Sequence, residues 1–116
     1  MKYIDALKST IDSWNENPIA DEWAFEKFRK EHIDLMSPVE AFDAIGATVP
    51  YLVQEGDEST ACEILQSILN LAAKAETTEL HSALHGEIVG IDEKFSMYGE
   101  YAKSKLLELK KYYRMS

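Results

Sequence analysis

Hydrophobic side chains recur along most of the chain at the three- and four-residue spacing of a helical face. The longest run of this kind comprises Ala61, Ile64, Leu65, Ile68, Leu69, Ala72 and Ala75. This period is typical of amphipathic helices, whereas half-buried strands alternate with period two, and no segment alternates for long enough to predict a strand. The pattern therefore predicts an all-α protein with the helix around residues 61–75 at the centre of its core.

Short polar motifs mark where helices are expected to begin. The stretch Ser37–Glu40, with the sequence SPVE, combines an N-cap serine, a proline at the first helical position and a glutamate at the third, so it predicts a capping box. Thr60–Glu63 is interpreted as a second capping box. Thr77 or Thr78 is expected to cap the next helix, and Asp92 the last one.

Other positions predict helix ends and buried faces. A first helix is expected over residues 2–14 and a second from about residue 20. In the third helix, Val39, Phe42 and Ile45 are expected to form the buried stripe. These assignments follow from the helical spacing of the apolar residues.

Glycine and proline predict interruptions. Gly46 followed by Pro50 is expected to break or kink the third helix, because proline cannot donate to the preceding turn. Residues 50–54 then form a short second helix or a bent continuation, while Gly90 ends a later helix. The whole pattern predicts an antiparallel array of five to seven helices, with a shape over residues 38–91 that resembles helical-repeat proteins.

The size of the chain indicates one domain. With 116 residues, 46% hydrophobic and 28% charged, residues 1–116 can bury a single core without a metal or disulfide. Cys62 is the only cysteine, which excludes an intrachain disulfide and favours a reducing compartment such as the cytoplasm. No apolar run approaches the roughly 20 residues that span a bilayer, and the amphipathic N-terminus is unlike a signal peptide.

The charge points to the class of partner. The net charge is -9, with 14 acids against 5 bases in residues 1–63 and 7 of each in residues 64–116. Nucleic acids and anionic membranes require cationic surfaces, so neither is expected as a direct partner. A basic protein is the better match, and the acidic N-terminal half is the expected contact region.

The stretch TTELHSALHGE, residues 77–87, is the sequence's best candidate for a metal site. His81 and His85 are four residues apart, so a helix would place both on one face. However, a catalytic zinc site needs three protein ligands, no third ligand follows from the helical positions, and HSALH lacks the glutamate of HExxH. Neither a phosphate-binding glycine loop nor another catalytic motif is present. We therefore expect a protein that is not an enzyme and has no cofactor.

The expected binding residues are acids from the N-terminal half. They are Asp21, Glu22, Asp43, Glu55, Asp57 and Glu58, with Tyr51 as a possible aromatic anchor. Acidic side chains would steer a cationic partner to the surface, and a tyrosine would supply contact area.

The chain also resembles a known class of proteins. The run from SPVEAFDAIGATVPYLV through ESTACEILQSILNLAAKAETTELHSALHGEI, in a small acidic all-helical chain, is similar to helical immunity proteins of bacterial toxin systems, including the contact-dependent inhibition type. The resemblance implies an antitoxin that binds and neutralises a cognate toxin domain, often a basic nuclease. It lies in helix succession and character, so it assigns no residue a role.

Two alternatives remain open from the sequence. The first is a helical adaptor or regulatory module that self-associates or binds a helix in an apolar groove, with binding that is insensitive to salt. The second is a metal-dependent enzyme that uses His81 and His85.

Overall fold

The computed structural model describes residues 2–17 and 22–115, and in these ranges it contains helices and no strand. The helices are α1 (Lys2–Glu16), α2 (Ala24–His32), α3 (Pro38–Gln54), α4 (Glu58–Ala75), α5 (Ser82–Phe95) and α6 (Glu100–Tyr112). Six helices within the described residues confirm the predicted all-α class and fall inside the predicted range of five to seven.

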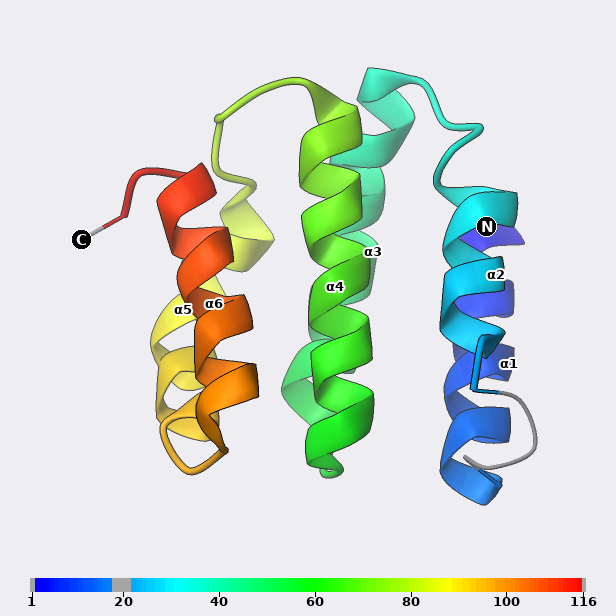
Figure 1. The fold of residues 1–116 in the computed structure, drawn as a ribbon. Helices are drawn as coiled ribbons and strands as arrows, with labels where there is room; N and C mark the ends of the chain where they lie inside the picture. The colour runs from blue at the N-terminus through cyan, green and yellow to red at the C-terminus, as the bar shows by residue number, and fades with distance from the viewer. Residues whose placement is uncertain (1, 18–21, 116) are drawn as a thin grey trace.

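The helices form three antiparallel pairs that stand side by side (Figure 1). The pairs are α1 with α2, α3 with α4, and α5 with α6, and the central pair contacts both outer pairs. Helices α1, α3 and α5 form one layer and α2, α4 and α6 the other, which gives a flat body of 38 × 34 × 18 Å. Successive helix pairs therefore stack side by side, and each pair packs on its neighbour.

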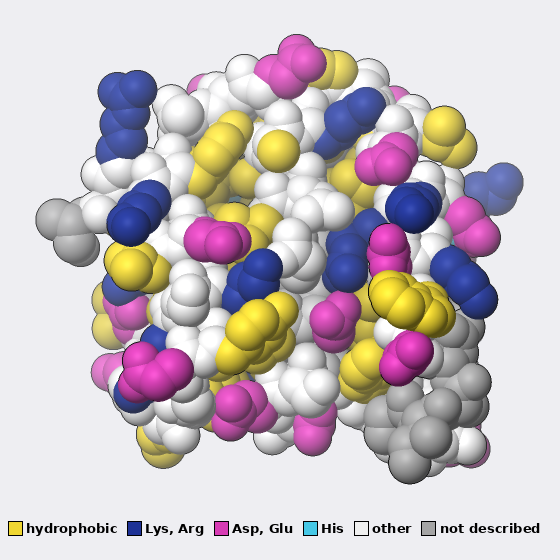
Figure 2. Space-filling view, in the orientation of Figure 1, with side chains coloured by type: hydrophobic (Ala, Val, Ile, Leu, Met, Phe, Trp, Pro, Cys, Tyr) yellow, Lys and Arg dark blue, Asp and Glu magenta, His cyan; other side chains and the backbone are white. Residues whose placement is uncertain are grey.

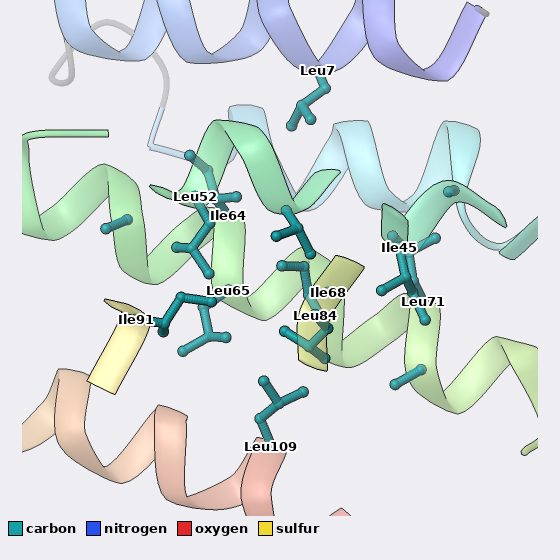
Figure 3. Packing of buried hydrophobic residues seen from close by; sticks show 14 of the residues in the cluster. Leu7, Ile45, Leu52, Ile64, Leu65, Ile68, Leu71, Leu84, Ile91 and Leu109 are labelled. Atoms are coloured by element: carbon teal, nitrogen blue, oxygen red, sulfur yellow. The ribbon is translucent and has the colours of Figure 1, made fainter. Parts of the chain in front are cut away.

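Helix α4 lies at the centre of the core, as the sequence predicts. Ten of its 18 residues are buried, and its interface with α3 is the most extensive in the fold. Figure 3 shows the side chains that surround it, which are contributed by α1, α3, α5 and α6 and include Leu7, Ile45, Leu52, Leu84, Ile91 and Leu109. The apolar face identified in the sequence is therefore covered from every side of the array.

Helix α3 begins at the predicted capping box. Ser37 Oγ accepts the Glu40 amide at 3.2 Å, and Glu40 Oε1 accepts the Ser37 amide at 2.9 Å. The predicted buried position of Val39 is wrong, because its side chain is 71% exposed. The buried face of α3 begins only at Ala41, beyond the first turn, and it includes Ile45 as predicted.

Helix α3 continues through Pro50 to Gln54, so the predicted alternative of a break with a separate short helix is wrong, and residues 50–54 are a continuation of α3. A proline inside a helix costs about 3 kcal/mol. Val49 and Leu52, on either side of it, are both fully buried, and each contributes about 1.5–3 kcal/mol by burial. The packing of these two neighbours therefore outweighs the lost hydrogen bond.

The second predicted capping box is also wrong. The N-cap of α4 is Asp57, whose Oδ2 accepts the Thr60 amide at 2.9 Å. Thr60 lies inside the helix with its side chain buried, and its hydroxyl is 2.6 Å from Asn15 Oδ1. The threonine thus links α4 to α1 and does not begin the helix.

The later boundaries differ from the predictions as well. Helix α5 is capped by His81 and not by a threonine, and it runs through Gly90 to Phe95. Asp92 therefore lies within α5, while Gly99 is the N-cap of α6.

The first two helices also differ from the predicted bounds. Helix α1 extends two residues past its predicted end, to Glu16, and α2 begins at Ala24. The expected start of the second helix, near residue 20, lies outside the described residues.

Candidate functional site

The direction of the helices gathers acidic residues at one end of the array. At this end α1, α3 and α5 finish and α2, α4 and α6 begin (Figure 1). We call it the acidic end, and it is defined by Glu16, Glu22, Glu55, Asp57, Glu58, Glu93 and Glu100. Figure 2 shows Asp and Glu side chains along the lower part of the face in view.

Hydrogen bonds hold the acids of the α3–α4 turn in place. Glu55 Oε2 accepts the Asp57 amide at 3.0 Å, and Glu55 Oε1 accepts Asn15 Nδ2 at 3.1 Å. Glu58 Oε2 accepts the Gly99 amide at 3.2 Å, which joins the turn to the start of α6. The carboxylates of Glu55 and Glu58 therefore link the central helix pair to both outer pairs, and their positions are set by the fold.

Within the described part of the chain, the acids of this turn form no ion pair, although Lys94 is close enough to Glu55 for the two charges to interact. The ion pairs found there involve Glu63, Glu26, Glu108 and Asp92, and not Glu55, Asp57 or Glu58. The N-terminus of α4 stabilises Asp57 and Glu58 through the helix dipole. The turn thus presents an anionic surface that remains available to a cationic partner.

Lys94 lies near this turn, and its ammonium group binds the end of α3. Its Nζ donates to the Leu52 and Val53 carbonyls, both at 2.9 Å, at the C-terminal end of α3. Burial lowers the pKa of Lys94, and the Glu55 carboxylate opposes this shift. Lys94 therefore caps α3 in the way expected of a cation at a helix C-terminus.

A shallow hollow of about 480 Å³ opens beside the turn. Acidic side chains and Tyr101 line it, and the tyrosine is 66% exposed. Cys62 also borders the hollow, and burial, with Glu58 and Glu63 nearby, raises the pKa of its thiol. A thiol held in its neutral form is a poor nucleophile.

The structure separates the predicted binding residues into two groups. Glu22, Glu55, Asp57 and Glu58 are at the acidic end, whereas Asp43 is exposed about 18 Å away along α3, at 1.5 Å per residue. These positions do not form one continuous surface.

The remaining two predicted residues also stand apart. Tyr51 is half-buried on α3 and packs against the core, so only part of its ring is accessible as an anchor. Asp21 lies outside the described residues.

The prediction that His81 and His85 share a helical face is wrong. His81 precedes α5, and its Nδ1 accepts the Ala83 amide at 3.0 Å. Its ring packs on Phe42 with 5.0 Å between centroids, while His85 is exposed on α5. Throughout residues 2–17 and 22–115, no three His, Cys, Asp or Glu side chains are grouped to hold a metal ion.

Tyr101, Glu93 and Glu100 lie at this surface but are not among the predicted binding residues. The last two belong to the C-terminal half, which is neutral in total, so the count by halves concealed them. For Glu100 the available signal was its place in the first turn of a helix, where acids are favoured, whereas Glu93 lies in the last turn of α5. Only the antiparallel order of the helices places those ends beside the α3–α4 turn.

No protein-family model, curated protein or solved structure matches this chain. Within the described residues, none of the helices has the length and apolar character needed to cross a membrane. The function is therefore inferred from the residues and geometry described above.

Proposed function

We propose that this chain is a non-enzymatic immunity protein that acts in the cytoplasm, where it binds and neutralises a basic toxin domain such as a nuclease. The observation that supports this proposal is the unpaired negative charge of Glu55, Asp57 and Glu58 at the acidic end. The resemblance to helical immunity proteins agrees with it.

Electrostatics favours this role for the acidic end. A nuclease binds its substrate through cationic groups that contact phosphates, so an anionic surface is complementary to its substrate-binding face. Long-range attraction raises association rates, which suits an inhibitor that must act before its toxin does. Covering the cationic face would exclude the nucleic acid.

The hydrogen bonds of the turn add to this complementarity. Glu55 and Glu58 are fixed by Asn15 and by the Gly99 amide, so less conformational entropy is lost when they contact a partner. The exposed ring of Tyr101 supplies an aromatic side chain of the type that dominates interface energies.

The test is a charge-removal experiment, and its probe is a basic nuclease domain that is encoded next to this gene and that the wild-type protein is first shown to bind. Asp57→Ser with Glu58→Gln removes two charges, and serine retains a side chain that can cap α4. The matched control, Asp5→Asn with Glu87→Gln, removes two charges from exposed sites away from the turn.

We expect the double variant at the turn to associate about tenfold more slowly at low salt, with the control close to wild type. The difference should shrink at high salt, because exposed charges are screened beyond about 8 Å at physiological ionic strength. Equal association rates for the two variants at low salt would contradict the proposal. Affinity that does not vary with salt would favour the adaptor alternative.

A further inference from the structure

Helix α5 begins at a side chain of a type that changes its charge near neutral pH. Its N-cap is His81, whose Nδ1 accepts the Ala83 amide at 3.0 Å. Helix N-caps are usually Ser, Thr, Asp or Asn, whose side-chain oxygens remain acceptors between pH 5 and 8, whereas histidine titrates in that range. The cap of α5 therefore differs from the caps of α3 and α4, which are Ser37 and Asp57.

Only the neutral imidazole can form this cap. Because Nδ1 accepts the hydrogen bond through its lone pair, the neutral ring carries its proton on Nε2. Protonation adds a hydrogen to Nδ1, so that the ring and the Ala83 amide would both be donors. The positive charge would also lie at the N-terminus of α5, where the helix dipole disfavours cations. A protonated His81 ring therefore loses the cap.

The same ring forms a close contact with α3. It packs on Phe42 with 5.0 Å between centroids, and a Cβ on Gly46 would lie 2.5 Å from its Cε1 and 2.6 Å from its Nε2. The ring thus occupies the space that a side chain at residue 46 would need. The cap of α5 and the contact of its first residue with α3 depend on one side chain, so a change in the charge of His81 acts on both.

This contact belongs to the main interface between the outer pair α5–α6 and the central pair. Helix α5 contacts α3 more extensively than α6 contacts α4. The turn before His81 is held separately, because the Tyr112 hydroxyl donates to the Thr77 carbonyl at 3.1 Å. Loss of the His81 contact would therefore weaken the packing of α5 on α3, while the contacts among α1, α2, α3 and α4 remain.

The charged groups around the ring do not replace the cap. The titratable residues on the elements that pack against it are Glu40 and Asp43 on α3, Glu76 and Glu79 in the preceding turn, and His85 and Glu87 on α5. All six are exposed, and within the described residues none forms an ion pair with His81, so solvent and salt screen their attraction for a protonated ring. Phe42 offers such a ring a cation–π contact, but a ring in that position still directs a donor at the Ala83 amide.

We propose that His81 is a pH-sensitive switch that controls the contact of α5 with α3. At pH 7.5 the neutral ring caps α5 and packs beside Gly46. As the pH falls toward 5, across the range in which histidine side chains titrate, the protonated ring leaves the cap and the outer pair α5–α6 separates from α3 more often. The switch lies at the start of α5, whereas the acidic end is where α5 finishes, and it does not depend on the immunity role.

Amide hydrogen exchange of the intact chain, followed by nuclear magnetic resonance at pH 7.5 and pH 5, tests the switch. The readout is the protection factor, which corrects for the effect of pH on chemical exchange, of Ile88 and Ile91 on α5 compared with Leu65 on α4. In wild type, the protection of the α5 amides relative to Leu65 should fall about fivefold at pH 5, as expected for the loss of one N-cap. An unchanged ratio would overturn the proposal.

Two variants show whether His81 is responsible. Asparagine is a strong N-cap that does not titrate, so His81→Asn should keep the ratio of α5 to α4 protection constant between the two pH values. His85→Asn removes the other histidine of α5, which is exposed, and should show the same fall as wild type. A fall in His81→Asn equal to that in wild type, or no fall in His85→Asn, would refute the assignment.

The state of the ring itself gives a readout that needs no substitution. Nitrogen-15 spectra of the His81 imidazole should show the proton on Nε2 at pH 7.5, and the Ala83 amide resonance should shift as the ring titrates. A proton on Nδ1 at pH 7.5, or an Ala83 amide that does not respond to the titration, would contradict the switch. These measurements use no partner, so their outcome is independent of the proposed function.

Discussion

The two ends of the helical array use their polar groups in different ways. At the acidic end, the carboxylates of Glu55, Asp57 and Glu58 accept backbone or side-chain hydrogen bonds, and those of Glu55 and Glu58 join the helix pairs. At the opposite end, the Ser37–Glu40 capping box is also exposed, but the Tyr3 hydroxyl is buried against Thr48, and the exposed Leu35 and Val39 lie outside the core. Stability and surface chemistry are therefore coupled wherever a cap is exposed, and they are separate at the exposed aliphatic side chains of the second end.

This difference determines which substitutions report on surface chemistry alone. Changing Asp57 alters both the charge of the surface and the cap of α4, so its effects need a variant that preserves capping. Changing Val39 alters only the surface.

Alkaline pH should lower the stability of the fold, because two tyrosines are buried at the end opposite the acidic end. Burial raises the pKa of Tyr3 to about 12 and that of Tyr113 to about 12, against about 10 for an unfolded chain. The contribution of the two tyrosines to the free energy of unfolding is complete below pH 10. It is lost as the pH rises toward 12, because the tyrosines ionise at a lower pH in the unfolded state. Tyr3 alone should account for about 2 kcal/mol of that loss.

Urea unfolding measured from pH 9 to 12 checks this prediction. Tyr3→Phe should be less stable than wild type at pH 9, because it loses the contact with Thr48, and should decline less on the way to pH 12. Parallel declines of the two proteins would show that the Tyr3 hydroxyl is not responsible. The Tyr113 hydroxyl is buried without a hydrogen-bond partner among the described residues, so Tyr113→Phe should cost little at pH 9.

Two glycine-to-alanine substitutions should have opposite effects on stability, because one glycine is closely packed and the other faces open space. A Cβ on Gly46 would lie 2.5 Å and 2.6 Å from His81 ring atoms, and that ring is held by its cap on Ala83 and by Phe42. We expect Gly46→Ala to lower the free energy of unfolding by about 1–2 kcal/mol. Gly86→Ala, with nothing within 4 Å of the added Cβ, should raise it by about 0.5–1 kcal/mol.

Chemical denaturation of both alanine variants measures these opposite changes. Stabilisation by Gly46→Ala would mean that the His81 ring moves aside at little cost, and that its contact with α3 contributes little to the start of α5.

An aspartate pair tests the contrast between the ends directly. Asp57→Ala should lower the free energy of unfolding by about 1 kcal/mol, because the Thr60 amide loses its acceptor. Asp43→Ala should change it by less than about 0.5 kcal/mol, since this exposed side chain makes no hydrogen bond or ion pair within the described residues. Thermal and urea unfolding supply the values, and equal losses in the two variants would remove the distinction.

The sequence predicted the helices better than their boundaries. The apolar spacing of residues 61–75 identified the central helix, because burial on one face produces that pattern directly. The box at Ser37 was also recognisable, since all its members are adjacent in sequence. Thr60 carried the same motif, but its hydroxyl is used by Asn15, 45 residues away, and Asp57 caps the helix in its place.

The candidate surface could be predicted only in part. The sequence identified Glu55, Asp57 and Glu58, because three acids within four residues are visible without a structure. It grouped them with Asp43, although the length of α3 separates the two positions. To know which acidic residues lie close together, one needs the directions of the helices. These directions depend on packing between segments that are distant in sequence.

The stacking of helix pairs also determines how this protein opens. Within the described residues the outer pair α1–α2 contacts α3 and α4 but makes no helix contact with α5 or α6. Either outer pair can therefore unfold locally while the central pair stays intact, since each loses only one interface. The slowest amide exchange should belong to α4, and any influence of one outer pair on the other must be transmitted through α3 and α4.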